Sequence, residues 1–125
     1  MPEKPVILVV DDDAPILILM QNLLRELGFE PLTAASGNEA IDIARGRRPS
    51  LVLLDKHMPG MSGADVIRAL RDDDDLAQLP ILIVSGEPVS KSELASLRAD
   101  GAVLKPFDVM ALVQQIREQL QLGRG

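Results

Sequence analysis

The sequence predicts an α/β protein built on an open, doubly wound sheet of five parallel strands, each followed by a helix. Two observations predict this class. Continuous apolar runs alternate along the chain with segments in which apolar residues recur at helical spacing. The runs are apolar throughout rather than at every second position, which is typical of parallel strands buried on both faces. Repeats of strand and helix imply such a sheet with helices on its two sides.

Four of the five strands are indicated by apolar runs. These runs cover residues 6–10, 51–54, 81–84 and, more briefly, 102–104. A weaker second strand is expected over residues 30–34, which include Pro31. Proline lacks the backbone N–H that a central strand donates, so we place this strand at an edge of the sheet. The strand order 2-1-3-4-5 satisfies that condition and keeps the other four strands contiguous.

Apolar stripes and capping signals mark the helices. The first helix is expected to stop at Gly28 and to bury one face. That face carries Ile16, Leu19, Met20, Leu23 and Leu27. Three later helices begin with the spacing of a capping box, at Ser36 with Glu39, Ser62 with Asp65, and Ser90 with Glu93. The last helix follows Asp108 as its N-cap. Residues 71–75, one arginine and four aspartates, are expected to form a solvated loop without a functional role.

The composition is that of one packed globular domain. The chain has 125 residues, of which 46% are hydrophobic, and it has no cysteine, which excludes disulfides and thiolate metal sites. With a net charge of −6 and no basic stripe, the chain is not expected to bind nucleic acid by itself. Because no apolar run is long enough for a bilayer and the N-terminus lacks a signal-peptide pattern, we expect no membrane insertion and a cytoplasmic location.

Polar residues stand where the apolar runs end. The first predicted strand is followed by the aspartates 11–13. The third ends at Asp55, the fourth at Ser85 and the fifth at Lys105. In open parallel sheets, ligands bind beyond the carboxyl ends of the strands, at the point where strand order reverses. We therefore expect these side chains to meet in one crevice.

Three of these side chains are carboxylates, and together they predict a cation site. Two carboxylates about 5 Å apart repel by roughly 3 kcal/mol at an effective dielectric constant near 20. Asp11, Asp12 and Asp55 would form three such pairs and would raise one another's pKa. A hard divalent cation removes the conflict, and all-oxygen ligands favour Mg²⁺, Ca²⁺ or Mn²⁺. A partly filled coordination shell suits Mg²⁺, which keeps waters and accepts a phosphate oxygen.

Ser85 and Lys105 suit a phosphoryl group at the same place. A lysine binds phosphate as a point charge, and a hydroxyl donates to a phosphoryl oxygen. Asp55 can then act as a nucleophile that accepts a phosphoryl group and forms an acyl phosphate. A cation and Lys105 would offset the charge on the transferring group.

Four motifs resemble those of a known family, the receiver domain of bacterial two-component response regulators. They are "VVDDDAP", "LVLLDKHMPGMSG", "ILIVSGE" and "GAVLKPF", and they occur in the family's order and spacing. The resemblance covers residues 6–120 and implies a flavodoxin-like (βα)5 fold. It also implies a single receiver domain over residues 1–125, with a core of about 6–121 and no output domain in this chain.

The resemblance implies roles for particular residues. Asp55 would be the phosphoacceptor for a sensor histidine kinase or a histidine phosphotransfer protein. The metal ligands would be Asp11, Asp12, Asp55 and the backbone carbonyl of His57, with Mg²⁺ as the cofactor and Mn²⁺ possible. Ser85 would be the switch hydroxyl and Lys105 the phosphate contact. The protein would catalyse only its own aspartyl phosphorylation and dephosphorylation.

The resemblance also implies how the signal leaves the domain. Phosphorylation would change the surface formed by the fourth helix, fifth strand and fifth helix, which a downstream output domain or protein would bind. The domain would be a monomer or a phosphorylation-dependent dimer. The fourth helix suits a switch because Leu94 and Leu97 are its only substantial anchors. The family usually has Tyr or Phe three residues before the lysine, whereas this chain has Ala102.

Three alternatives stand beside this hypothesis. A degenerate receiver would bind partners without being phosphorylated, which the Ala102 departure allows. A haloacid-dehalogenase-type phosphatase would need a second aspartate where His57 stands. A flavodoxin-type flavin carrier would need a hydroxyl-rich phosphate loop in place of the three aspartates after the first strand. The set of Asp11, Asp12, Asp55, Ser85 and Lys105 favours the phosphorylated receiver.

Overall fold

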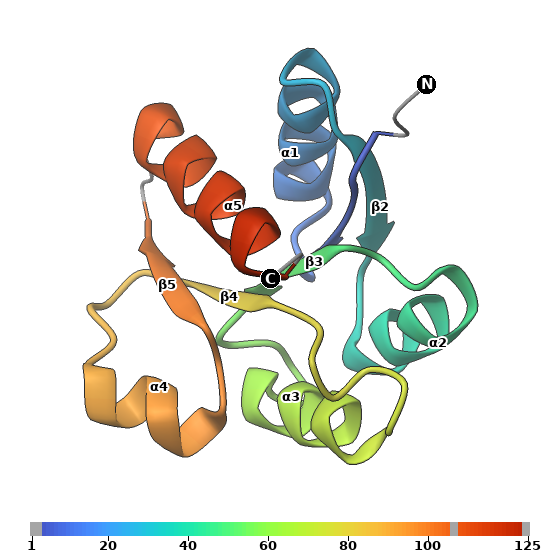
Figure 1. Cartoon of the computed structure of the whole chain (residues 1–125), viewed down its shortest axis with the longest axis vertical. Helices are drawn as coiled ribbons and strands as arrows, with labels where there is room; N and C mark the ends of the chain where they lie inside the picture. The colour runs from blue at the N-terminus through green and yellow to red at the C-terminus, as the bar shows by residue number, and fades with distance from the viewer. Residues whose placement is uncertain (1–3, 106–107, 124–125) are drawn as a thin grey trace.

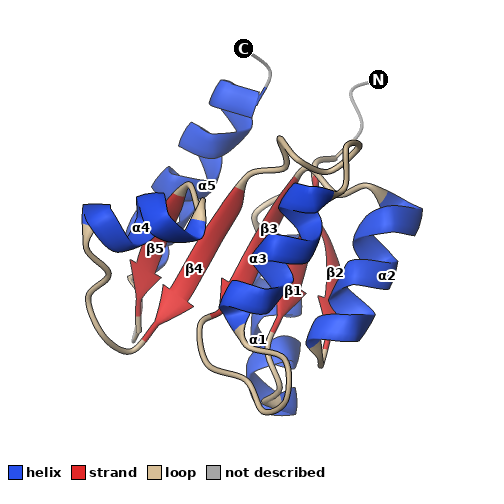
Figure 2. Cartoon of the chain, turned by 90° about the horizontal axis from the view of Figure 1, so that it is seen from below, coloured by secondary structure: helices blue, strands red, loops and turns tan. Residues whose placement is uncertain are grey.

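A computed structural model of the protein describes residues 4–105 and 108–123, and it contains all five predicted strands. They are β1 (Val6–Val10), β2 (Glu30–Ala34), β3 (Leu51–Asp55), β4 (Ile81–Ser85) and β5 (Gly101–Leu104). All neighbouring strands are parallel, and the order is β2-β1-β3-β4-β5 (Figure 2). The predicted fold class and strand order are therefore confirmed.

The edge position of β2 is confirmed as well. Pro31 is paired in register with Ile7 of β1, and β2 has no strand on its other side. β3 and β4 each run one residue further than the apolar runs that predicted them. Asp55 and Ser85 are consequently the last residues of these two strands.

Five helices cover the two faces of the sheet. They are α1 (Ala14–Glu26), α2 (Gly37–Arg47), α3 (Gly63–Asp72), α4 (Lys91–Leu97) and α5 (Val109–Gly123). α1 and α5 lie on one face, and α2, α3 and α4 lie on the other (Figure 1). Successive strand residues point to opposite faces, so that Ile7 belongs to the core under α1 and α5 and Leu8 to the core under the other three helices. This arrangement explains the uninterrupted apolar runs.

The predicted N-caps are confirmed. The side chains of Ser36, Ser62 and Ser90 each accept a hydrogen bond from the backbone N–H three residues later. At α5, Asp108 accepts the N–H of Met110 at 2.8 Å. A fully reciprocal capping box forms only at Ser62. At α4 the acidic partner of the box binds elsewhere, as described below.

The predicted buried face of α1 is partly wrong. Leu19 is 57% exposed, whereas Leu24, which the predicted stripe omitted, is fully buried. The buried face centres on Met20 and Leu24. Successive residues of a helix are turned by about 100°, so Leu19 lies to the side of that face.

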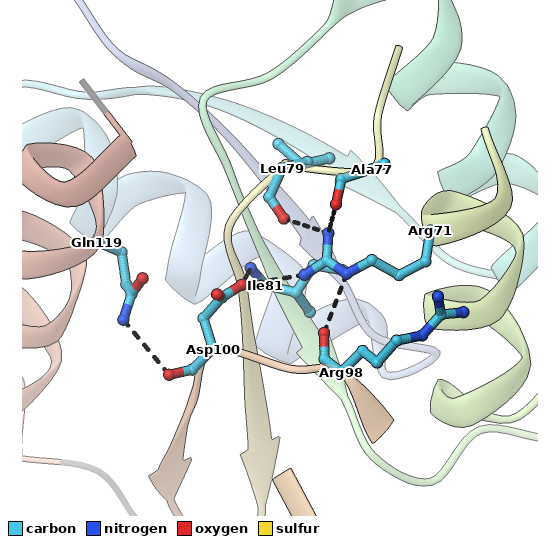
Figure 3. Close-up of polar contacts among 7 residues, drawn as sticks. All are labelled: Arg71, Ala77, Leu79, Ile81, Arg98, Asp100 and Gln119. Carbon is cyan, nitrogen blue, oxygen red and sulfur yellow. Dashed lines mark hydrogen bonds and ion pairs between the residues drawn. The ribbon is translucent and has the colours of Figure 1, made fainter. Parts of the chain in front are cut away.

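The prediction of a solvated loop over residues 71–75 is wrong for Arg71. α3 continues to Asp72, and the side chain of Arg71 is only 9% exposed. Figure 3 shows its guanidinium contacting the carbonyl oxygens of Ala77, Leu79 and Arg98 and the carboxylate of Asp100. An arginine has five N–H donors, which lets one side chain bind several loop carbonyls at once.

The aspartates of the same run pair with neighbouring helices. Asp73 contacts Arg45 of α2 at 3.2 Å, Asp75 contacts Arg48 at 3.3 Å, and Asp72 lies 3.8 Å from Arg98. Acidic residues at the C-terminal end of a helix oppose its dipole. Arg45 at the end of α2, and Arg48 and Arg98 directly after α2 and α4, offset that charge. Within the described ranges, no helix is long and apolar enough to cross a membrane.

Candidate functional site

The described part of the chain buries three polar residues, and all three stand at the carboxyl edge of the sheet. Asp11 is 4% exposed, Asp55 9% and Ser85 2%. Asp11 follows β1, while Asp55 and Ser85 end β3 and β4. Because β1, β3 and β4 are adjacent and parallel, their carboxyl ends meet at one place. Burial of polar groups is costly without partners, so this concentration marks the candidate site.

The three predicted carboxylates meet at this edge. Asp11, Asp12 and Asp55 each offer an oxygen, and these atoms lie within 4.8 Å of one another. Asp11 is oriented by the backbone N–H of Asp13, which donates to its Oδ1 at 2.9 Å. Asp12 is the exposed member of the set.

Lys105 completes the cluster from the end of β5. Its Nζ lies 3.5 Å from Asp11 Oδ2 and 3.7 Å from Asp55 Oδ1. The backbone N–H of Lys105 donates to the carbonyl oxygen of Ser85 at 2.7 Å. This hydrogen bond joins the residue after β5 to the end of β4. Three carboxylates and one ammonium leave two negative charges, the amount that one divalent cation neutralises.

The pKa of Asp55 is raised in this cluster, mainly because the carboxyl group is buried. Burial raises the pKa of Asp55, because desolvation penalises the carboxylate. The N–H of His57, which donates to Asp55 Oδ1 at 3.3 Å, lowers that pKa, and the charge of Asp11 raises it. Lys105 lowers it and Asp12 raises it. On balance, the pKa of Asp55 lies above the usual value for an aspartate.

The donor set fits a hard divalent cation. All three side chains provide oxygen atoms, which Mg²⁺ and Mn²⁺ prefer over nitrogen or sulfur. Because Asp12 is exposed, solvent reaches this carboxylate. The backbone carbonyl of His57 stays a prediction as a fourth ligand, although the turn places the backbone N–H of that residue against Asp55.

Ser85 lies beside the cluster with its hydroxyl already engaged. Ser85 Oγ donates to the carbonyl oxygen of Glu87 at 2.8 Å and accepts the N–H of Glu87 at 3.0 Å. Both bonds hold the start of the loop between β4 and α4. Ala102, where the family's aromatic residue would stand, is half-buried on β5 and packs against the core under α4.

One contact near the site was not predicted. Lys56, the residue after Asp55, contacts Glu93 of α4 with 2.8 Å between Nζ and Oε2. The spacing of Ser90 and Glu93 predicted that this carboxylate would cap its own helix. Nothing in the local pattern indicates a partner 37 positions away, so only the tertiary structure reveals the pair.

Comparison with known proteins identifies the family. The model of the response regulator receiver domain matches residues 7–117 of the chain. The chain belongs to this family. The DNA-binding response regulator MtrA of Mycobacterium tuberculosis is 38% identical to this receiver domain over 117 residues, which cover 92% of the chain and 50% of MtrA. The receiver domain thus spans about half the length of the curated relatives it matches.

Solved structures agree with the family and the fold. The chemotaxis protein CheY4 of Vibrio cholerae superposes on this receiver domain with a TM-score of 0.87 at 30% identity, covering 92% of this chain and 98% of CheY4. A response regulator receiver protein of Pseudomonas putida gives a TM-score of 0.84 at 28% identity, covering 94% and 99% of the two chains. These likenesses confirm the flavodoxin-like fold.

Proposed function

We propose that this receiver domain acts in a two-component phosphorelay and that Asp55 accepts a phosphoryl group in a Mg²⁺-dependent reaction. The donor is a sensor histidine kinase or a histidine phosphotransfer protein. One observation carries the proposal. The buried carboxylate of Asp55 lies among two further carboxylates and the ammonium of Lys105, at the carboxyl edge of the sheet.

Asp55 is the nucleophile of the proposed reaction. A carboxylate oxygen attacks the phosphorus of the donor's phosphohistidine, and a phosphorus–oxygen bond forms while the phosphorus–nitrogen bond breaks. The imidazole leaves with its electron pair and takes up a proton. Lys105 binds the transferred group by its charge. The chain catalyses only this reaction and the hydrolysis of its own acyl phosphate.

Asp11, Asp12, Asp55 and the carbonyl of His57 hold Mg²⁺, with Mn²⁺ as a substitute. When bound, the cation supplies positive charge that offsets the negative charge of the incoming phosphoryl group. Asp11 and Asp12 repel a phosphoryl group while they lack a cation. These residues therefore make the reaction depend on the divalent ion.

Ser85 links the phosphoryl group to the surface formed by α4, β5 and α5. A hydroxyl has one proton to donate, and here the carbonyl of Glu87 accepts it. To donate to a phosphoryl oxygen instead, Ser85 must release that carbonyl, which removes one of its two hydrogen bonds to Glu87 and loosens the loop that leads into α4. With Ala102 in place of an aromatic residue, backbone movement and α4 carry the change.

The wider role of the chain follows from its family. We infer that residues 1–125 form one receiver domain, with its core at about 6–121, and that it works in the cytoplasm. MtrA is named a DNA-binding response regulator. By analogy, the partner downstream is an output domain or protein, while this domain itself does not contact nucleic acid. It acts as a monomer or as a dimer that forms on phosphorylation.

Intact-mass spectrometry tests the chemistry. The protein is incubated with phosphoramidate, a small phosphodonor, in the presence of Mg²⁺. We expect the mass of one phosphoryl group to be gained, with no gain in Asp55→Asn or when a chelator replaces Mg²⁺. Asp108→Asn, which alters an exposed helix cap far from β3 in sequence, is a matched control and should still be phosphorylated.

The same experiment addresses the degenerate receiver. If the wild-type protein gains no mass while Mg²⁺ binds, the chain is a phosphorylation-independent interaction module and the proposal is wrong. A Ser85→Ala variant examines the switch, because it should be phosphorylated but should not transmit the change to α4. Full response of α4 in that variant would contradict the role of Ser85.

A further inference from the structure

α4 is the helix of the described chain that the core holds least. None of its seven residues is buried, and only Leu94 and Leu97 pack partly against the core. Its position therefore depends on polar contacts to an unusual degree. These contacts gather at its two ends, and the two ends differ.

The C-terminal end of α4 is fixed by a group of contacts that we name the Arg71 anchor. Arg71 of α3 donates from Nε to the carbonyl oxygen of Arg98 at 3.0 Å, directly after α4, and from Nη2 to Asp100 at 3.1 Å (Figure 3). The same guanidinium donates to the carbonyls of Ala77 and Leu79 at 3.0 and 2.7 Å. Asp100 also accepts the N–H of Ile81 at 2.8 Å. This end is thus joined to α3, β4 and β5 together.

The N-terminal end of α4 depends on one ion pair. Glu93 contacts Lys56 at 2.8 Å, and their side chains are 37% and 20% exposed. The neighbouring loop is held by the Ser85 hydroxyl through Glu87. The proposed phosphoryl contact of Ser85 would loosen this loop. Among the described residues, the ion pair would then be the side-chain contact that joins the first turn of α4 to the segment after β3.

Open space lies next to this ion pair. A cavity of 210 Å³ is lined by Lys56 and Glu93 and, among others, by Leu54, Ile83 and Leu97. Residues of β3, α3, β4 and α4 thus line it together. The cavity leaves room for Glu93 and the first turn of α4 to move.

We propose that α4 moves as a lever that turns about the Arg71 anchor and is held at its other end by the Lys56–Glu93 ion pair. The pair keeps the first turn of α4 in the position that it has while Asp55 is unphosphorylated. Its strength sets how often unphosphorylated protein visits the shifted position. The effect on phosphorylation rests on the proposed function, whereas the lever itself concerns the unphosphorylated chain.

Amide hydrogen exchange of the unphosphorylated protein tests the lever. Glu93→Gln removes the charge of the pair and keeps the size of the side chain. We expect exchange to become about twofold to fivefold faster at amides of residues 86–94, the effect of losing a partly exposed ion pair, with no change at residues 95–100. Lys56→Gln should give the same pattern from the other side of the pair.

Asp72→Asn is the matched control, because it removes an ion pair with Arg98 near the opposite end of α4. It should leave exchange at residues 86–94 unchanged. Unchanged exchange there in both Glu93→Gln and Lys56→Gln would overturn the proposal. Equal acceleration along the whole helix would also overturn it, because α4 would then unfold as a unit instead of turning about its C-terminal end.

Binding of beryllofluoride, a phosphoryl mimic, provides a second measurement. If the shifted position favours the mimic, Glu93→Gln should bind it about twofold to fivefold more tightly than the wild type, in the presence of Mg²⁺. Unaltered affinity together with altered exchange would overturn the link between the ion pair and Asp55. A wild-type protein that does not bind the mimic contradicts the proposed function, while the exchange result still decides the lever.

Discussion

The two ends of the sheet differ in whether their buried charged side chains are paired with opposite charges. At the carboxyl end, Asp11 and Asp55 are buried close to Asp12, and Lys105 is their nearest cation. At the amino end, Arg71 is buried to a similar degree, but each of its three guanidinium nitrogens binds an oxygen. One end has an excess of negative charge, and the other is balanced within the chain.

The pKa values report the same contrast. Burial raises the pKa of Asp55, and two neighbouring aspartates oppose its ionisation further. Burial lowers the pKa of Arg71, but Asp100 favours its charged form by its charge and by a hydrogen bond. The comparison teaches that buried charge at the amino end is paired within the chain, whereas the carboxyl end keeps an excess of carboxylates, the feature from which we propose a cation site.

Removing Arg71 should have the largest effect on stability. In Arg71→Leu, the carboxylate of Asp100 and three loop carbonyls lose their shared donor. Leaving several partly buried polar groups without their shared donor costs about 3 kcal/mol of the free energy of unfolding. Urea denaturation with the variant and the wild type at equal pH measures this loss.

Arg71→Lys separates charge from geometry in that experiment. Lysine keeps the positive charge but lacks the planar guanidinium that donates to several acceptors at once. About half of the loss in the free energy of unfolding should therefore remain. A stability equal to the wild type in Arg71→Leu would show that the amino end is not held by this side chain. The contrast between the two ends would then be wrong.

Magnesium should act on the carboxyl end alone. At a free Mg²⁺ concentration ten times the Kd, the wild type should gain about 1.4 kcal/mol of stability, because the ion binds the folded state. Asp55→Asn should lose most of this gain and, without Mg²⁺, should be about 1 kcal/mol more stable than the wild type. Thermal unfolding with Mg²⁺ and with chelator measures both effects, and an unchanged Mg²⁺ response in Asp55→Asn would contradict the site.

The sign of the pH dependence follows from the raised pKa of Asp55. The folded protein holds this proton more tightly than the unfolded chain does, so the contribution to stability is present at low pH and is lost as the pH rises through the folded pKa. Asparagine does not titrate. The stability advantage of Asp55→Asn in metal-free buffer should therefore grow as the pH increases.

Breaking an exposed ion pair should have the smallest effect. Asp75 and Arg48 are each about two-thirds exposed, and the atoms in contact are 3.3 Å apart. Asp75→Asn should lower the free energy of unfolding by less than about 0.5 kcal/mol, and added salt should reduce the difference further. A loss as large as that of Arg71→Leu would show that exposure does not distinguish these contacts.

Local sequence patterns were sufficient for the strand order and for the residues gathered at the site. Pro31 placed β2 at the edge, because a missing N–H excludes a central position whatever surrounds it. Asp55, Ser85 and Lys105 could be placed together because parallel strands carry their carboxyl ends to one edge. Leu19 was wrongly predicted to be buried. Apolar residues at helical spacing cover a broad face of a helix, and the packing of the helix on the sheet decides which part of that face is buried.

The sequence by itself determined the caps, which depend on neighbours within a few positions. It also determined the sheet and the acidic cluster, because the order of parallel strands follows from the apolar runs and carries their carboxyl ends to one edge. The tertiary structure decided the burial of Arg71, the partner of Glu93 and the two unequal ends of α4. These contacts join residues that are 6 to 37 positions apart in the chain. Their formation depends on how α3, α4 and the loops pack against one another. The local sequence of a charged run such as residues 71–75 does not indicate that packing.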